Sequence, residues 1–405
     1  MKNNRFRISI LFFTVAVAML GFGIVIPILP FYIESFGASG STLGLLMASF
    51  AVMQFIFAPI WGDLSDRYGR KPILILGVLG TALCHLLFGL SSQLWMLFFA
   101  RAMAGILSSA TMPAAMAYVA DSTSEEERSS GMGILRAALG VGIILGPGIG
   151  GWFASISLSF PFYLAAALSA LAVLPICVAL PESLPPEKRG LPGTDVSGLQ
   201  PGALWQALFG PIGFLLLLAF LLSFALTGFE GIFALYTFKL YGYGPERVGT
   251  IIVLIGIISA TMQGVLTGPL SRRWGETCII QISLLVCAVG FVLMLQAETY
   301  YEVLLTVGFF IIGNALLRPT VTSLISKSTT RAQGKALGLN NAYMSLGRIF
   351  GPVCAGFLFD SNISYPYLIG SAVMLVGLFG SFLWLEDAPL TVKTNCSGSK
   401  ESGQI

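Results

Sequence analysis

The sequence predicts an all-α membrane protein in which twelve transmembrane helices form two six-helix bundles. Hydrophobic residues make up 56% of the 405 residues and charged residues only 10%, which is too little charge for the water-facing surface of a soluble protein of this size. The apolar runs are continuous over about 20 residues, the length that crosses a bilayer as a helix, and do not alternate as barrel strands do. This composition excludes a soluble enzyme, a nucleic-acid-binding protein and a disordered chain.

Twelve apolar segments are the candidate membrane helices. The first follows a basic N-terminus, as a signal peptide would, but its apolar run from Ile8 to about Ile33 is too long and lacks a small-residue cleavage site. An even number of crossings places both termini on the same side of the membrane. The segments are 8–33, 42–61, 73–92, 94–120, 131–153, 160–180, 208–240, 248–267, 277–296, 301–326, 335–359 and 365–385.

The basic residues predict the orientation of these helices. With the termini in the cytoplasm, sixteen of the 22 Lys and Arg residues lie on the cytoplasmic side, and only Lys239 and Arg247 lie on the opposite side. Because loops rich in Lys and Arg stay in the cytoplasm, we expect both termini to be cytoplasmic. The remaining four basic residues lie within spans: Arg101, Arg136, Arg318 and Arg348.

The longest polar interruption divides the chain near its middle. It runs from Pro181 to about Leu204 and contains two consecutive prolines, several glycines and two basic residues, a composition typical of a linker. Four regions are therefore expected: an N-terminal bundle over 1–180, a cytoplasmic linker over 181–204, a C-terminal bundle over 205–390 and a cytoplasmic tail over 391–405.

The two halves repeat at an offset of about 206 residues. The sequence GDLSDRYG at 62–69 recurs as GPLSRRWG at 268–275, and Gly-Pro at 146–147 recurs at 351–352. A repeat in the same orientation predicts two similar bundles related by an axis along the membrane normal. Such bundles hold a substrate site between them near the midplane and expose it to each side in turn.

The loop after the second span resembles the G-x-L-x-D-R-x-G-R-K signature of the major facilitator superfamily. The resemblance implies the major facilitator fold and a gate in this loop, with Asp66 at the N-terminus of a neighbouring helix and basic residues that pair with Asp121. The alternative is that the basic residues only anchor the loop in the cytoplasm. In the second half Arg272 and Glu276 replace Asp66 and Arg70, which predicts an asymmetric gate. The expected gate residues are Gly62, Asp63, Asp66, Arg67, Gly69, Arg70, Lys71 and Asp121.

Small residues in the fifth span resemble the motif of drug/proton antiporters within this superfamily. Closely spaced glycines let helix backbones approach, and the proline bends the helix; ordinary packing of small residues is the alternative. Leu20 and Gly21, followed by Pro27 and Pro30, resemble a pattern of the twelve-span drug antiporters. The antiporter motif comprises Gly133, Gly142, Gly146, Pro147, Gly150 and Gly151.

Glu230 in the seventh span is the principal candidate for coupling, because ionisable residues in a bilayer are costly and it is the only acid deep in any span. A carboxyl group removed from water favours its protonated form and can exchange protons near neutral pH. Phe229, Phe233 and Tyr236 form a stripe along the helix that suits a lipophilic cation. Alternatively, Glu230 is the structural partner of a buried arginine such as Arg318.

The segment around Glu230 is similar to that of the quinolone and multidrug efflux pumps of Gram-positive bacteria, with the pattern S-F-x-L-x-x-F-E-x-x-x-x-L-Y. The resemblance extends to about Leu385. It implies that Glu230 couples transport to protons and, through the motif Arg101-x-x-x-Gly105, that Arg101 takes part. Asn314 stands where an aspartate is expected in this subgroup, so Glu230 has no second acid beside it. Gln54 and Asn314 are further candidates for binding substrate.

We therefore predict a proton-coupled exporter of lipophilic, often cationic drugs in a bacterial cell membrane. The expected partners are a small-molecule substrate, protons and the bilayer, with no nucleic acid, and the expected state is a monomer. No cofactor, metal or enzymatic activity is expected, since the sequence has no P-loop and no HExxH motif. An exporter of a sugar, amino acid or siderophore is the alternative with the same fold. The repeat and the absence of a paired nucleophile and base disfavour a receptor or an intramembrane enzyme.

Overall fold

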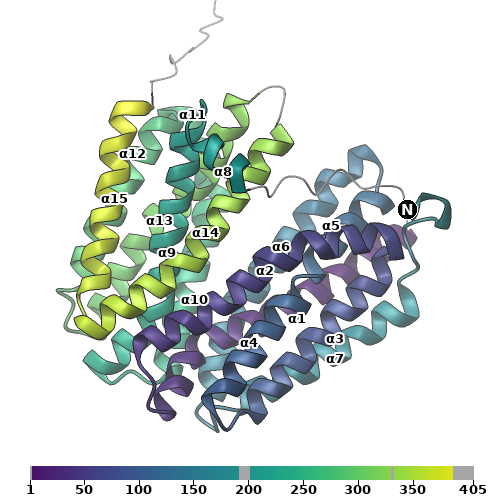
Figure 1. Cartoon of the computed structure of the whole chain (residues 1–405), viewed down its shortest axis with the longest axis horizontal. Coiled ribbons are helices and arrows are strands. Elements are labelled where there is room, and N and C mark those ends of the chain that lie inside the picture. Colours follow the sequence, from purple (N-terminus) through teal and green to yellow (C-terminus); the bar gives the residue numbers. More distant parts are fainter. Residues whose placement is uncertain (1, 191–200, 330–332, 386–405) are drawn as a thin grey trace, which may run out of the picture.

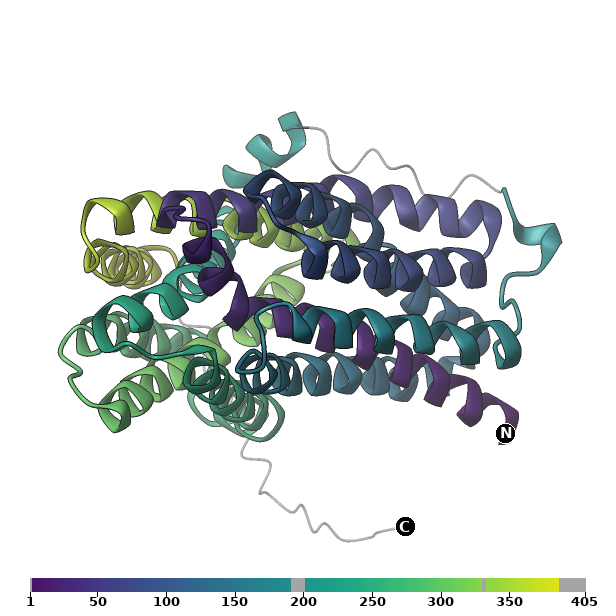
Figure 2. The same cartoon turned by 90° about the horizontal axis from the view of Figure 1, so that it is seen from below.

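The computed structural model is all-helical over the residues it describes, which are 2–190, 201–329 and 333–385. These residues contain twelve segments that are long and apolar enough to cross a membrane. They form two bundles side by side (Figures 1 and 2). The predicted fold class and the predicted number of spans are therefore confirmed. The expected tail over 391–405 and much of the expected linker lie outside the described residues.

The N-terminal bundle contains the first six spans, one of which is divided between α4 and α5. Helix α1 continues through Pro27 and Pro30 to Ser35, so these prolines do not end it. Hydroxyl side chains cap two of the other helices, Ser39 at α2 and Ser124 at α6. The helices are α1 (Lys2–Ser35), α2 (Gly40–Tyr68), α3 (Arg70–Leu90), α4 (Leu94–Ser108), α5 (Thr111–Ser122), α6 (Glu125–Phe153) and α7 (Phe160–Ala179).

The C-terminal bundle repeats this arrangement. Its second span is divided into α10, the π-helical turn η3 and α11, and Thr299 and Glu302 form a capping box at the start of α13. Two short helices, η1 (Pro186–Lys188) and α8 (Pro201–Leu208), lie between the bundles in the chain. The remaining elements are α9 (Gly213–Tyr241), α10 (Pro245–Thr261), η3 (Met262–Leu266), α11 (Thr267–Trp274), α12 (Glu276–Met294), α13 (Tyr300–Ser328), α14 (Gln333–Ser361) and α15 (Tyr365–Trp384).

Equivalent glycines end the second span of each half. Gly69 separates α2 from α3 with φ of 109°, and Gly275 separates α11 from α12 with φ of 78°. Only glycine adopts such positive φ values without steric cost. The same backbone break at the same position of the repeat gives both halves the same sharp connection.

Small residues set the packing inside each bundle. A Cβ atom at Gly146 would lie 2.6 Å from the carbonyl oxygen of Leu20, so α6 and α1 are in backbone contact. In the other half, a Cβ atom at Gly347 would lie 2.6 Å from the carbonyl oxygen of Phe220, which places α14 directly against α9. Such contacts replace the hydrophobic driving force that helices lack in lipid.

The two bundles touch at one end and diverge at the other. The most extensive contacts are those of α2 with α14 and of α6 with α10, and they lie at the end opposite the start of α1 and the end of α15, where Gly44 meets the backbone of Pro352 and Gly151 meets that of Pro245. Figure 1 shows the bundles diverging from this end like the arms of a V. The space between the bundles is therefore open toward the end that carries the termini.

Asp360 of α14 adds a polar contact at the closed end. Its carboxylate accepts hydrogen bonds from the backbone N–H groups of Gly40, at 2.7 Å, and Ser41, at 2.9 Å. These N–H groups are the unpaired donors at the N-terminus of α2, where the helix dipole favours a negative charge. One bundle thus caps a helix of the other.

Candidate functional site

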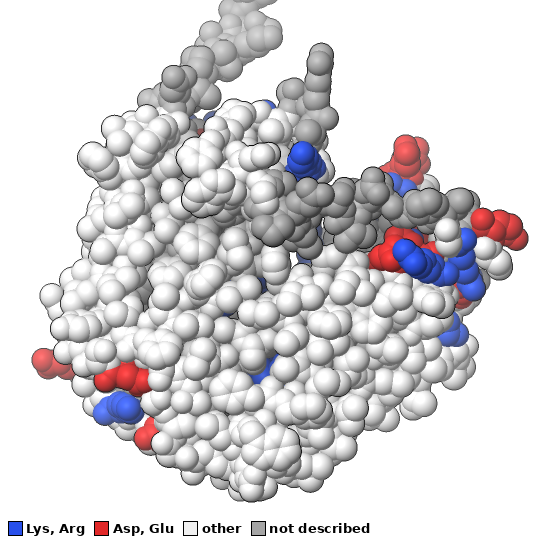
Figure 3. Space-filling view, viewed as in Figure 1, with Lys and Arg blue, Asp and Glu red and all other residues white. Residues whose placement is uncertain are grey.

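A cavity of about 260 Å³ lies between the bundles. Most of its wall is apolar, and the polar groups come from helices of both bundles. In Figure 3 charged side chains gather mainly at the two ends of the molecule, and a few basic ones are visible in the groove between the bundles. The polar and charged residues that line the cavity are Gln54, Arg101, Ser223, Thr227, Glu230, Asn314, Arg318, Thr322, Asn340 and Arg348.

Helix α9 presents Ser223, Thr227 and Glu230 to the cavity, because positions i, i+4 and i+7 lie on one helical face. Hydrogen bonds fix this face against α14. The Ser223 hydroxyl donates to the carbonyl oxygen of Met344 at 2.6 Å. The Thr227 hydroxyl lies 2.8 Å from the carbonyl oxygen of Ser223 in its own helix and 3.3 Å from that of Gly347 in α14, and it shares its proton between them. These bonds satisfy two hydroxyl groups and fix the rotation of the helix that carries Glu230.

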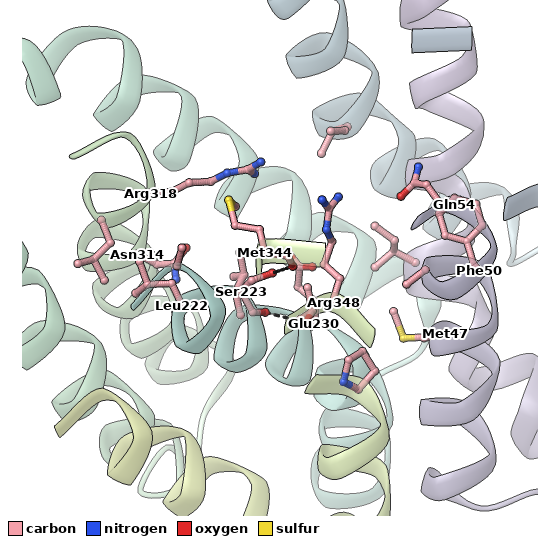
Figure 4. Close-up of a pocket in the computed structure, with 18 of the residues that line it drawn as sticks. Met47, Phe50, Gln54, Leu222, Ser223, Glu230, Asn314, Arg318, Met344 and Arg348 are labelled. Atoms are coloured by element: carbon pink, nitrogen blue, oxygen red, sulfur yellow. Dashed lines mark hydrogen bonds between the residues drawn. The ribbon is translucent and has the colours of Figure 1, made fainter. Parts of the chain in front are cut away.

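Glu230 lines the cavity and its side chain is exposed there, and Figure 4 shows it beside Ser223 and Arg348. Within the described residues it makes no ion pair shorter than 4 Å. The charges of Arg318 and Arg348 act on it at longer range. The structural alternative from the sequence, a direct salt bridge to Arg318, is therefore not formed in this state, and the carboxylate is free to bind a ligand.

Arg101 reaches the cavity from α4 of the N-terminal bundle. The residue is 3% exposed, and its guanidinium carbon lies 4.6 Å from the centre of the Phe50 ring. Its buried Nε has no hydrogen-bond partner in the described structure. Stacking on an aromatic face compensates part of the cost of burying this charge, and it holds the guanidinium in place on the cavity wall.

Of the six residues expected to bind substrate, the structure places Glu230, Gln54 and Asn314 on the cavity wall. The other three do not line it: Phe229, Phe233 and Tyr236 are at most 5% exposed. Consecutive helical residues point about 100° apart, so the aromatic stripe beside Glu230 faces the interior of the C-terminal bundle.

The core of that bundle accounts for the three aromatic side chains. The Phe229 ring lies 5.2 Å from that of Phe310, and the Tyr236 ring lies 4.5 Å from that of Tyr367. The aromatic groups that line the cavity are instead Phe22 of α1 and Phe50 of α2. Sequence reasoning missed both. The membrane-spanning part of α1 is almost uniformly apolar, so periodicity does not reveal its cavity face. On α2, Phe50 lies four residues before the predicted Gln54 and shares its helical face, which is the signal that could have found it.

The predicted gate residues form a cluster inside the N-terminal bundle. Arg70 is nearly buried, and its Nε donates to the Asp121 carboxylate at 2.9 Å, while a second nitrogen contacts Asp66. Asp63 pairs with Arg67 at 2.9 Å. In this state Asp66 thus contacts an arginine of its own bundle, and not the N-terminus of a neighbouring helix as expected.

The rest of the cluster differs from the expectation. The Lys71 ammonium group donates to the carbonyl oxygen of Cys177 and not to Asp121. Glu182, which sequence reasoning missed, accepts hydrogen bonds from the backbone N–H groups of Arg70 and Lys71 and so caps α3. Gly62 and Gly69 lie in the same segment, and Gly69 provides the positive φ that turns α2 into α3.

The second half carries the equivalent ion pair with its charges exchanged. Glu276 and Lys327 lie 2.9 Å apart, and they stand 206 residues after Arg70 and Asp121. Each pair joins the third span of a half to the fourth. Both pairs stabilise the fold of one bundle, and neither links the two bundles in this state.

The glycines of the antiporter motif divide between two interfaces. Gly142, Gly146 and Gly150 pack against the backbone of α1 inside the bundle, whereas Gly151 packs against α10 of the other bundle. No neighbouring atom lies within 4 Å of a Cβ atom placed at Gly133. Pro147 lies inside α6, and its carbonyl oxygen faces Gly249 of α10.

Two six-helix bundles with a charged cavity between them define a membrane transporter of the alternating-access type. The chain matches the profile of the Major Facilitator Superfamily over residues 11–329 and 266–398, and it belongs to this family. It is a multi-pass membrane protein with twelve spans.

Curated relatives cover nearly the whole chain. The chain is 36% identical to Multidrug resistance protein 2 of Bacillus subtilis, over 93% of this chain and 94% of that protein. It is 33% identical to Multidrug resistance protein 1 of the same organism, over 97% of this chain and 100% of that protein. It is also 33% identical to Quinolone resistance protein NorA of Staphylococcus aureus, over 92% and 95%.

Solved structures share the fold. The human organic anion transporter MFSD10 superposes with a TM-score of 0.69 at 25% identity, over 93% of this chain and 99% of that one. The nucleoside transporter NupG superposes with a TM-score of 0.79, over 94% of this chain and 100% of that one. The two sequences are 16% identical, so this match supports the fold alone.

Proposed function

We propose that this protein is a proton-coupled multidrug exporter of a bacterial cell membrane, acts as a monomer and has both termini in the cytoplasm. The names of the Bacillus and Staphylococcus relatives support drug efflux, and the excess of Lys and Arg on the side of the termini supports the orientation. One observation carries the proposal: Glu230 lines the cavity between the bundles and has no ion-pair partner among the residues that the structure describes.

The proposed mechanism is competition between a proton and a cationic substrate for Glu230. In the state described here the cavity opens toward the termini, so a drug enters from the cytoplasm and its cation binds the deprotonated carboxylate. Its apolar body contacts Phe22 and Phe50. Rocking of the bundles then exposes the cavity to the outside, where a proton displaces the drug. Arg101 holds a fixed positive charge on the cavity wall that the other bundle forms, and in this proposal it influences the exchange.

Replacing Glu230 by Gln tests this proposal. Glutamine keeps the shape of the side chain but neither ionises nor pairs with a cation, so we expect efflux of ethidium to fall by at least about tenfold. Efflux from cells and uptake driven by a proton gradient into everted vesicles measure the effect. Glu126→Gln, an exposed acid in the first turn of α6, is the matched control. Full activity of Glu230→Gln would exclude this residue as the proton carrier.

A further inference from the structure

The cavity carries more positive than negative charge. Its lining includes three arginines, Arg101, Arg318 and Arg348, and a single acid, Glu230. With the carboxylate ionised the wall bears a net charge of about +2, and with the carboxylate protonated about +3. A site built only for cations does not require this excess.

None of the three guanidinium groups has a carboxylate within 4 Å in the described structure. Arg101 stacks on Phe50. Arg348 donates one hydrogen bond of 3.3 Å to the hydroxyl of Ser345. Within the described residues the Arg318 guanidinium donates no hydrogen bond, and only the backbone carbonyl of this residue accepts one, from Thr322. Charged groups at membrane depth are costly unless they are paired, so these cations would gain free energy from an anion in the cavity.

Arg318 and Arg348 are placed to share such an anion. They come from the neighbouring helices α13 and α14, and Figure 4 shows both guanidinium ends in the same part of the cavity, away from the Glu230 carboxylate. The two positive charges repel each other. A carboxylate or sulfonate between them would relieve this repulsion and accept the forked hydrogen bonds that guanidinium groups form with planar anions.

We propose that Arg318 and Arg348 form an anion-binding subsite, and that the cavity therefore also takes amphiphilic organic anions with an aromatic body. The aromatic part lies against Phe22 and Phe50, and Arg101 adds attraction from the other bundle. This inference rests on the proposed function only in using the same transport cavity. It extends the substrate class from lipophilic cations to carboxylates and sulfonates of similar size.

The subsite predicts opposite effects of Glu230 on the two classes of ligand. A negative carboxylate attracts a cation and repels an anion in the same cavity. The charged groups that line the cavity beside Glu230 are Arg318 on α13, Arg348 on α14 and Arg101 on α4, whereas α1 and α2 contribute none. Glu230→Gln should therefore weaken the binding of cations and strengthen the binding of anions several-fold.

A matched pair of fluorescent probes tests the proposal. 1-Naphthaleneacetate and 1-naphthaleneethylammonium share an aromatic ring and differ in charge. Their binding to the purified protein in nanodiscs, and their counterflow exchange in proteoliposomes, are measured for the wild type, for Glu230→Gln and for the double variant Arg318→Gln/Arg348→Gln. Arg136→Gln, an exposed arginine of α6 that does not line the cavity, is the control.

We expect the double variant to lose at least about tenfold in affinity for the anion and to keep its affinity for the cation, which also shows that it is folded. An unchanged anion affinity in this variant, or a wild type that binds the cation but not the anion, would overturn the inference and leave the proposed function standing. Conversely, anion binding that requires both arginines, together with full cation efflux by Glu230→Gln, would support the subsite and contradict the proposed mechanism.

Discussion

At the scale of single residues, Glu230 and Asp360 show how one carboxylate acquires different roles from its surroundings. Glu230 has no ion-pair partner in the described structure and faces the cavity, whereas Asp360 accepts two backbone hydrogen bonds from the N-terminus of α2. The first is available to a ligand. The second is already occupied, and it holds the two bundles together at their closed end.

Asp360→Asn should therefore loosen the closed end. The amide removes the negative charge from the helix N-terminus and leaves one acceptor oxygen, a change that costs about 0.5–2 kcal/mol at a helix cap and shifts the balance between conformations about two- to thirtyfold. Spin labels at Ser157 and Tyr301, which lie on different bundles at this end, report the distance distribution. A longer distance should become populated. The control variant is Glu298→Gln, an exposed acid at the same end. An unchanged distance distribution in Asp360→Asn would show that this cap does not hold the two bundles together.

At the scale of elements, the glycines of α6 determine how closely this helix approaches α1. A Cβ atom at Gly146 would lie 2.6 Å from the carbonyl oxygen of Leu20, whereas one at Gly140, on the same helix, would meet no atom within 4 Å. The two positions are a matched pair for measuring the contribution of backbone contact to stability. Gly146 belongs to the antiporter motif and Gly140 does not, yet Gly133 also belongs to it and meets no atom within 4 Å. Membership of the motif therefore does not reveal which glycines are in contact, because the direction of each glycine depends on how α6 packs.

Gly146→Val should force α6 away from α1 and reduce stability by about 1–3 kcal/mol, the usual cost of overpacking. Gly140→Val should have little effect. Thermal unfolding of the detergent-solubilised protein, followed by the loss of its monodisperse peak in size-exclusion chromatography, measures both variants. If both variants lost the same stability, the cause would be the low tolerance of helix α6 for β-branched residues, and not the contact between α6 and α1.

The ends and faces of the elements show what the sequence could and could not predict. Hydropathy located all twelve spans, because apolar length is a direct consequence of bilayer thickness. The predicted second span, 42–61, is shorter than the observed helix α2, Gly40–Tyr68. The helix continues for polar turns beyond the apolar run, and hydropathy does not detect these turns. Glu230 was predicted as a functional residue because an ionisable side chain inside a membrane span costs free energy. The inward direction of Phe229 and the cavity position of Arg348 depend on the rotation of α9 and α14, which tertiary packing determines.

At the scale of the whole molecule, transport requires the closed end to open. The second contact at this end joins α6 to α10, where the indole nitrogen of Trp152 donates to the hydroxyl of Thr250 at 3.2 Å. In a background without native cysteines, cross-linking Trp152→Cys to Thr250→Cys with a short thiol reagent should abolish efflux but leave the binding of ethidium intact. Cleavage of the cross-link should restore efflux.

The control for this experiment is a cross-link inside one bundle, between Leu90→Cys and Tyr163→Cys. Tyr163 already donates a hydrogen bond of 2.7 Å to the carbonyl oxygen of Gly89, so joining these helices should not restrict the motion between bundles. Loss of efflux in both cross-linked proteins would mean that the bundles do not move as rigid bodies. Continued efflux with α6 joined to α10 would exclude rocking at this interface.

The acids of α2 and α14 have a consequence for the energetics of the cycle. The two helices contact each other, and each ends near an acid, Asp66 in α2 and Asp360 in α14. A carboxylate near the C-terminus of its own helix is unfavourable there and is stabilised at the N-terminus of another. If Asp66 reaches the start of α14 when the open end closes, the two caps are mutually exclusive. The two caps are then coupled, because strengthening one of them must depopulate the conformation that forms the other. A mutation at either end of the molecule would therefore change the access to the cavity from both sides of the membrane.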